Sequence, residues 1–109
     1  MSTPVTLKDG TIRYFNEKKQ LHREDGPAII WLSGDKEWFL NGKRHRQGAP
    51  AIEFAEVKVW YIDGKKHRED GAAVEYNEES LNQYFLRDKE VKASSLIEFL
   101  SIVRFKAFI

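Results

Sequence analysis

Apolar and polar side chains alternate over short stretches of the chain, with the two-residue period of a half-buried β-strand. In residues 52–54 and 74–76, apolar side chains flank a glutamate. In residues 38–40 and 60–62, a tryptophan and an aliphatic side chain share a face in the same way. The pattern predicts a mainly β protein built from short strands with one apolar face.

The last part of the chain changes to helical spacing. Ser95 and Glu98 form a capping box, and the apolar side chains Leu96, Phe99 and Leu100 follow on one stripe. We therefore predict a C-terminal α-helix over residues 95–106, packed on the sheet, because a single sheet with one apolar face needs a cover.

This helix is more apolar than a simple cover requires, because Ile97, Phe105 and Phe108 widen its apolar stripe. One interpretation is a concave sheet that wraps the helix. A second is self-association or a partner surface, for which Phe105 and Phe108 are the candidate residues. Docking on a membrane surface is the third, and the few Lys and Arg residues of the polar face argue against it.

A segment of eight residues occurs three times along the chain. The copies are residues 21–28 (LHREDGPA), 44–51 (RHRQGAPA) and 66–73 (KHREDGAA). An aromatic-led segment precedes each copy, and a fourth, diverged one follows. The leading rings are Tyr14, Trp38, Trp60 and Tyr84, with spacings of 24, 22 and 24 residues. A period in this range indicates stacked copies of one supersecondary unit.

Local turn chemistry defines that unit. Asn41-Gly42 and Asp63-Gly64 are hairpin signals, because both central residues of a type I′ turn need a positive φ. The expected strands are residues 28–32, 37–40, 43–46, 51–54, 59–62, 65–68 and 73–76. The predicted fold is an antiparallel meander of about four tandem β-hairpin repeats in a curved sheet. We assign the repeats to residues 11–91 of a single domain that spans residues 1–109.

Composition narrows the choice of function. The 109 residues include 18 Lys and Arg, 17 Asp and Glu, and no Cys. The absence of Cys excludes a disulfide scaffold, a thiolate zinc site and a cysteine nucleophile. The balanced charge argues against a nucleic acid partner held by bulk electrostatics. Because no secretory signal and no membrane-spanning run is visible, we expect a soluble, cytoplasmic protein without membrane contact.

Each copy of the eight-residue segment contains a histidine followed by an arginine. A histidine and a carboxylate two residues apart on a strand would suit acid–base catalysis or a metal ion. A motif present in every copy, however, normally serves what every copy needs, which is to form the turn and to pair neighbouring copies. In this interpretation, the histidine packs against a ring, Arg and Glu pair across strands, and Asp sets the glycine turn. The residues with this structural role are His22, Asp25, Gly26, Gly42, His45, Gly64, His67, Asp70 and Gly71. We predict no catalytic residue, no metal site and no cofactor, and thus no enzyme.

Arg23, Arg46 and Arg68 offer an alternative, because with Trp38 and Trp60 they would form a ladder of cations and rings. Such a ladder resembles a surface for a nucleotide or a single-stranded nucleic acid. In two of the three copies the arginine has acidic neighbours, which favours a self-paired face. These five residues are the candidate binding residues of the sheet.

The string His-Arg-Glu-Asp-Gly-Pro-Ala, preceded by an aromatic residue and Asn-Gly-Lys, resembles a short repeat of small proteins of tailed bacteriophages and large DNA viruses. That repeat is similar in turn to the MORN family. The resemblance covers residue 12 to about residue 91. It implies stacked hairpins and a scaffold that contacts proteins or lipids without chemistry. The chain departs from the pattern at residues 47–49, at Ala72 and throughout the fourth copy.

The resemblance further implies a phage-encoded protein in the cytoplasm of the host cell. It would bind a host protein, as an inhibitor of a bacterial defence system. Two alternatives stay open: a module that sequesters a nucleotide or another small anion through the arginines, and a structural or assembly protein of the virion.

Overall fold

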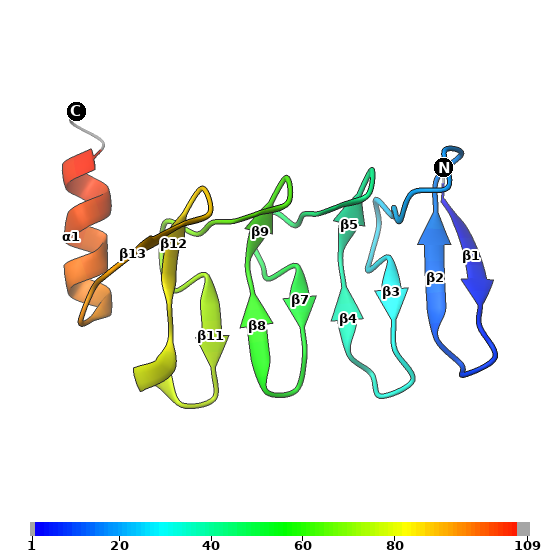
Figure 1. Cartoon of the computed structure of the whole chain (residues 1–109), viewed down its shortest axis with the longest axis horizontal. Coiled ribbons are helices and arrows are strands. Elements are labelled where there is room, and N and C mark those ends of the chain that lie inside the picture. Colours follow the sequence, from blue (N-terminus) through cyan, green and yellow to red (C-terminus); the bar gives the residue numbers. More distant parts are fainter. Residues whose placement is uncertain (1, 107–109) are drawn as a thin grey trace.

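The computed structural model describes residues 2–106, which form short β-strands, one 3-10 turn and one α-helix (Figure 1). The strands are β1 (Thr3–Thr6), β2 (Ile12–Phe15), β3 (Ile29–Ile30), β4 (Lys36–Glu37), β5 (Phe39–Leu40), β6 (Lys43–Arg44), β7 (Ile52–Glu53), β8 (Val57–Val59), β9 (Tyr61–Ile62), β10 (Lys65–Lys66), β11 (Val74–Tyr76), β12 (Tyr84–Leu86) and β13 (Lys89–Val91). The 3-10 turn is Glu79–Leu81, and helix α1 is Leu96–Lys106.

Seven strands form one antiparallel sheet in the order β1-β2-β3-β4-β7-β8-β11. Three further hairpins, β5–β6, β9–β10 and β12–β13, form small sheets of two strands each. In Figure 1 the hairpins follow one another in a row from the N-terminus to the helix. The predicted mainly β meander with one C-terminal helix is thus confirmed.

The large sheet begins earlier than residue 11, where the sequence placed the first repeat. Strand β1 pairs with β2 over its full length, with Thr3 opposite Phe15 and Thr6 opposite Ile12. The turn between them is closed by Asp9, whose Oδ1 accepts a hydrogen bond from the Thr11 N–H at 2.9 Å. Gly10 supplies the positive φ of +90° that this turn requires.

Two expected strands, residues 37–40 and 59–62, are each divided at the tryptophan. Strand β4 ends at Glu37, which pairs within the large sheet, whereas Phe39 pairs with Arg44 in a small hairpin. Trp38 lies between them and bonds to both sides: its N–H donates to the Ala51 carbonyl, and its carbonyl accepts from the His45 N–H. Pairing partners therefore change at the tryptophan, and one continuous strand cannot form.

The basic strands are also shorter than the ranges 43–46 and 65–68. Strand β6 ends at Arg44, because the N–H of Arg46 donates to the carbonyl of Tyr61 in the following copy. In the same way Arg68 N–H donates to the Phe85 carbonyl. These residues join one copy to the next instead of extending their own hairpin.

The core of the described residues includes a cluster next to strands β3 and β5. Ala28, Ile29 and Phe39 form a buried cluster, against which Leu21 and Trp31 pack. Glu37, which is opposite Ile29 in the large sheet, is 4% exposed, and its carboxylate accepts hydrogen bonds from Trp31 Nε1 at 2.9 Å and Arg44 Nη2 at 3.1 Å. These bonds compensate for the desolvation of a buried carboxylate.

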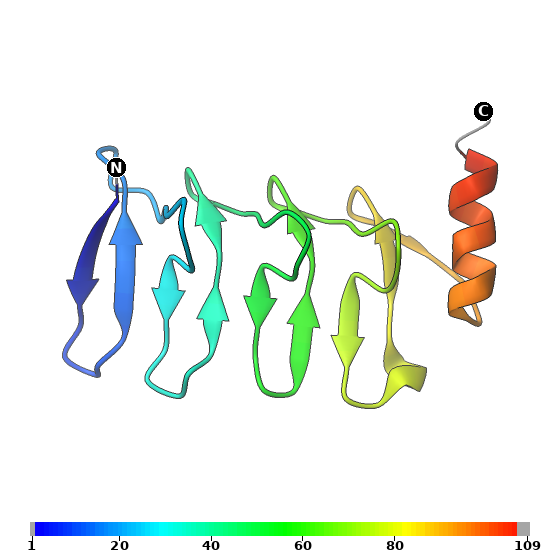
Figure 2. The same cartoon turned by 180° about the vertical axis from the view of Figure 1, so that it is seen from behind.

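Helix α1 begins at Leu96, one residue later than predicted, and ends at the predicted Lys106; its predicted cap is present, since Ser95 Oγ accepts from the Glu98 N–H at 3.1 Å. Glu98 returns the contact to Ser94, whose Oγ donates to its carboxylate at 2.9 Å. The helix stands beyond the last hairpin, at the end of the sheet and not across its face (Figures 1 and 2). Phe99, with no exposed surface, is its buried contact with the sheet. No helix within residues 2–106 is both long and apolar enough to cross a bilayer.

Candidate functional site

Each histidine of the repeated motif links its copy to the next one. The Nδ1 atoms of His22, His45 and His67 accept hydrogen bonds from the N–H groups of Asn41, Asp63 and Arg87, at 2.9, 3.0 and 3.0 Å. These three donors are the first central residues of the tight turns, with φ of 50°, 49° and 50°. The histidine therefore fixes the following turn through its ring nitrogen, a contact more specific than the ring packing we expected.

Each arginine of the motif lies over the leading ring of its own copy. The guanidinium carbon is 4.1 Å from the Tyr14 ring centre for Arg23, and 3.8 Å from the Trp38 ring centre for Arg46. Arg68 lies 3.8 Å from the Trp60 ring centre. Each guanidinium also donates to a carbonyl four residues further on; the acceptors are Pro27, Pro50 and Ala72, at 3.2, 3.1 and 3.1 Å. The arginine thus links the turn that follows it to the leading ring of its copy.

Carboxylates complete these contacts. Asp25 accepts from Arg23 Nε at 2.9 Å, and Asp70 accepts from Arg68 Nε at 2.8 Å. The hydrogen bond from Arg23, together with its charge, lowers the pKa of the Asp25 carboxyl group. These two aspartates were predicted to set the glycine turn, and the structure shows them holding the arginine instead.

A side chain at either glycine next to these aspartates would crowd the end of the arginine side chain. A Cβ on Gly26 would lie 2.8 Å from Cζ of Arg23, and one on Gly71 would lie 2.7 Å from Cζ of Arg68. The middle copy has Gly48 and Ala49 at the positions of Asp and Gly. There Arg46 keeps its contacts with the Trp38 ring and the Pro50 carbonyl, and its Nη1 donates to Glu53 Oε2 at 3.1 Å, as Arg68 Nη1 pairs with Glu75 at 3.2 Å. The arginine therefore keeps its ring and carbonyl contacts in a copy that lacks the aspartate and has Ala49 in place of the glycine.

Of the five candidate binding residues of the sheet, Arg46 lies on Trp38 and Arg68 lies on Trp60, whereas Arg23 lies on Tyr14. The side chains of Arg23, Arg46 and Arg68 are 20, 28 and 18% exposed, and each pairs with a carboxylate. Trp60 Nε1 donates to Glu75 Oε1 at 2.8 Å. Anion or nucleotide binding by this ladder stays a prediction, and these contacts do not favour it.

The fourth copy is completed by the helix. Phe99 stacks on Tyr84 with ring centres 4.6 Å apart and an interplanar angle of 27°. In the other copies this place over the leading ring holds the arginine. Helix α1 therefore caps the row of repeats by placing an apolar ring where the motif would place a cation.

The outer side of α1 exposes large apolar side chains. Ile97 is 79% exposed and Phe105 is 67% exposed, and Leu96 and Leu100 lie beside them at the surface. Phe105 is thus a surface residue, as the partner-surface interpretation requires, whereas Phe108 lies outside the described residues. The sheet does not enclose the helix.

Histidine and glutamate of the motif approach each other, with Nε2–Oε1 distances of 3.3 Å in both His22–Glu24 and His67–Glu69. Within residues 2–106, no group of three or more His, Asp or Glu side chains is placed to hold a metal ion. Catalytic and metal roles for these pairs have no further support in this geometry.

No protein-family model matches the chain, and neither the curated proteins nor the solved structures include a significantly similar one. The resemblance to phage repeats and the MORN family therefore stays a prediction from the motif.

Proposed function

We propose that this protein is a non-catalytic protein-binding module whose partner contacts the outer face of helix α1, defined by Leu96, Ile97, Leu100 and Phe105. The observation that carries the proposal is the exposure of these four side chains on a helix of 11 residues. Leu96 and Leu100 are four residues apart, which is a spacing of the anchors by which helices enter grooves of other proteins. Large apolar side chains that are exposed on one element of a small protein mark a candidate interaction site.

The contacts of the repeats also support the helix as the interaction site. Their histidines, arginines and aspartates bond to one another and to the next turn, so they build a scaffold. The helix lies outside the repeated motif. The resemblance to repeats of phage proteins makes a protein of a bacterial host the proposed partner, and inhibition of a defence system the proposed effect.

The test is capture of a partner from bacterial lysate with matched surface variants. Ile97→Ser should abolish capture, because it removes the most exposed apolar anchor while serine has a helix propensity close to that of isoleucine. Leu32→Ser is the control, since Leu32 is 78% exposed and Ile97 is 79% exposed. Equal capture by both variants, or equal loss in both, would contradict the proposal.

The proposed inhibition is tested on the captured protein itself. Its activity should fall when the wild-type chain is added at a one-to-one ratio and should be unaffected by Ile97→Ser. A captured protein whose activity is the same with and without the wild-type chain would show that the binding is not inhibitory.

A further inference from the structure

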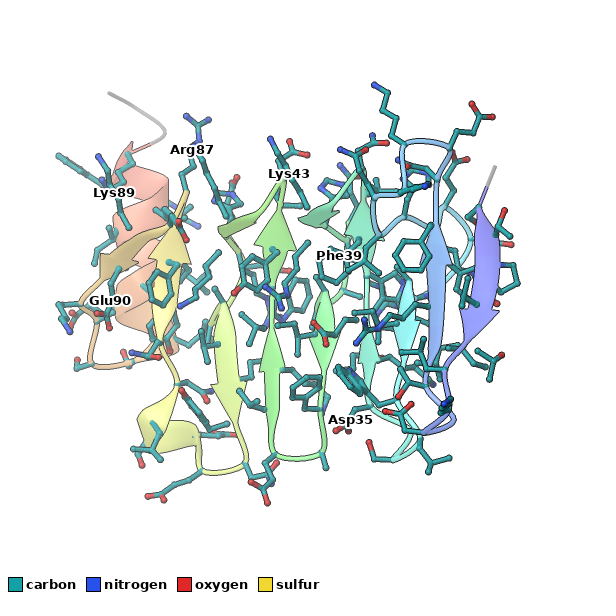
Figure 3. All side chains as sticks on the ribbon, turned by 45° about the vertical axis from the view of Figure 1, so that its right-hand side comes forward. Asp35, Phe39, Lys43, Arg87, Lys89 and Glu90 are labelled. Atoms are coloured by element: carbon teal, nitrogen blue, oxygen red, sulfur yellow. The ribbon has the colours of Figure 1, made fainter. Side chains whose placement is uncertain are left out.

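A cleft lies between helix α1 and the tip of hairpin β12–β13. Its lining residues are His67, Glu69, Leu86, Arg87, Lys89, Val103 and Lys106. Figure 3 shows Arg87 at the tip of this hairpin and Lys89 on the side of the helix. The cleft therefore combines three cationic side chains with the apolar side chains of Leu86 and Val103.

The positive charge of this cleft is not neutralised by the ion pairs of the described residues. None of those pairs includes Arg87, Lys89 or Lys106. Glu69, the acidic side chain of the lining, is 3.3 Å from His67 Nε2. The neighbouring Asp88 accepts from the backbone N–H of Lys66 at 3.1 Å.

Arg87 occupies a backbone conformation that disfavours arginine. Its φ is 50° and that of Asp88 is 71°, so both central residues of this turn are left-handed without glycine. The equivalent turns use Asn41-Gly42 and Asp63-Gly64, which adopt these angles at lower cost. The backbone contact does not need arginine either, because Asn41 and Asp63 donate to their histidines as Arg87 does. Residues held in costly conformations are concentrated at functional sites.

The positive charge is a property of the last copy and not of the repeat. The corresponding hollow in the first copy is lined by Asn16, Glu17, Lys18, His22, Glu24 and Asn41. That lining contains two glutamates and one lysine, whereas the last copy has two lysines, one arginine and one glutamate. The sign of the charge is therefore reversed between the two ends of the sheet.

We propose that this cleft binds an acidic segment of a partner protein, with carboxylates on Arg87, Lys89 and Lys106 and an apolar side chain against Leu86 and Val103. The proposal rests on the protein-binding function proposed above and adds a second contact with its own chemistry. Arginine presents a fork of donors that matches a carboxylate, and the lysines contribute point charges. A peptide is favoured over a nucleic acid because the lining contains no Phe, Tyr or Trp ring for stacking a base, and its apolar part is aliphatic.

The probe is a fluorescein-labelled decapeptide of alternating Leu and Glu, titrated into the ¹⁵N-labelled full chain. We expect amide shifts at residues 86–89 and 103–106, and affinity that falls with added salt. Arg87→Asn and Lys89→Glu should each weaken binding about tenfold. Lys43→Glu and Lys65→Glu are the matched controls at the position of Lys89 in the earlier copies, and they should bind the peptide as the wild type does.

Arg87→Asn also separates binding from structure, because it removes the charge while it relaxes the turn. The variant should have a higher Tm and a weaker affinity, which damage to the fold would not produce. Equal losses for Lys43→Glu and Lys89→Glu, or shifts spread over the whole sheet, would overturn the proposal. Tighter binding of an oligo(dT) strand than of the peptide would overturn it in favour of a nucleic acid.

The proposal for the cleft and the proposal for the outer helix face can be refuted independently. Capture of a partner that is lost with Lys89→Glu but kept with Ile97→Ser would retain the cleft and refute the helix face. The reverse result, together with no peptide binding, would refute the cleft and leave the proposed function standing.

Discussion

The leading aromatic ring is covered by an arginine in the inner copies and by a phenylalanine in the last copy. In the inner copies an arginine covers the leading ring, as Arg68 covers Trp60 at 3.8 Å. In the last copy Lys92 stands at the position of this arginine, but its side chain is 87% exposed and pairs with Glu90. The ring of Tyr84 is covered by Phe99 of the helix instead.

The difference shows what the arginine needs. Arg68 is held by the Ala72 carbonyl, by Asp70 and by Glu75, all of which follow it in the chain. The last copy is followed by a helix and has no such bend, so a cation over Tyr84 would lack acceptors. An apolar ring needs none, and its burial supplies the stabilisation. The contrast between a braced cation and a docked ring can be tested by substitution, beginning with the ring.

Phe99→Ala should have the largest effect, a loss of about 3 to 4 kcal/mol of unfolding free energy, because the side chain is fully buried. The free energy is measured by urea denaturation, with helix docking followed through the Tyr84 environment by NMR. Phe105→Ala on the exposed side should change stability by less than about 0.5 kcal/mol. Similar losses for the two variants would mean that the helix is not docked through Phe99.

His22→Ala should lower the free energy of unfolding by about 2 kcal/mol. His22 is 7% exposed, and its removal leaves the N–H of Asn41 without an acceptor. His22→Asn places an amide oxygen near Nδ1 and should restore part of this loss. Denaturation of both variants gives the comparison. If the alanine and asparagine variants are equally destabilised, the contribution of His22 is packing and not the hydrogen bond.

The double substitution Arg87→Asn with Asp88→Gly should raise stability by up to about 1 kcal/mol, because it gives the last turn the residues of the second copy. The loss of the hydrogen bond from the Lys66 N–H to Asp88 Oδ1 reduces this gain. The opposite change, Gly42→Asp, should lower stability by a similar amount. Its cost would come from the φ of +81°, since the nearest atom to a Cβ there is 3.6 Å away. Thermal unfolding of both variants checks this, and a loss of stability in the double variant would show that the last turn is not strained.

Asp25→Asn should have the smallest effect and should depend on pH. The hydrogen bond from Arg23 lowers the pKa of Asp25 in the folded chain, so the unfolded chain binds more protons in acid. The contribution is therefore present above the ordinary pKa of aspartate, near pH 4, and is lost as the pH falls below it. Urea midpoints between neutral pH and acid should fall less steeply for the variant. In an Arg23→Ala background the substitution should no longer change that slope, and a persisting change would mean that another group is responsible.

The sequence was sufficient to predict the repeat, the two Asn-Gly and Asp-Gly turns and, to within one residue, the bounds of the helix, because these depend on local chemistry. It did not predict strand β1, since residues 3–6 carry no copy of the motif and only Asp9-Gly10 marks their turn. The division at Trp38 was missed because it depends on which strand pairs with each side of the tryptophan. Glu37 was missed as a buried residue because a glutamate in an alternating strand indicates solvent, until Trp31 and Arg44 are placed beside it.

The candidate site could be predicted from the sequence only in part. The exposed side chains of the helix follow from its apolar excess, which the sequence displays. The cationic cleft does not, because Arg87, Lys89 and Lys106 meet only where the end of the helix lies beside the last hairpin. The signal present in the sequence was Arg87-Asp88 at a turn that elsewhere contains glycine.

The histidine contacts all run forward, from one copy to the turn of its successor, and this direction governs how such a chain can change in length. A duplicated copy inserted between the second and third would receive a histidine from its predecessor and give one to its successor. A copy added after the fourth would meet Val91, which stands in place of a histidine, and would displace Phe99 from Tyr84. Duplication can therefore lengthen the interior by steps of 22 to 24 residues, while both ends are inherited unchanged.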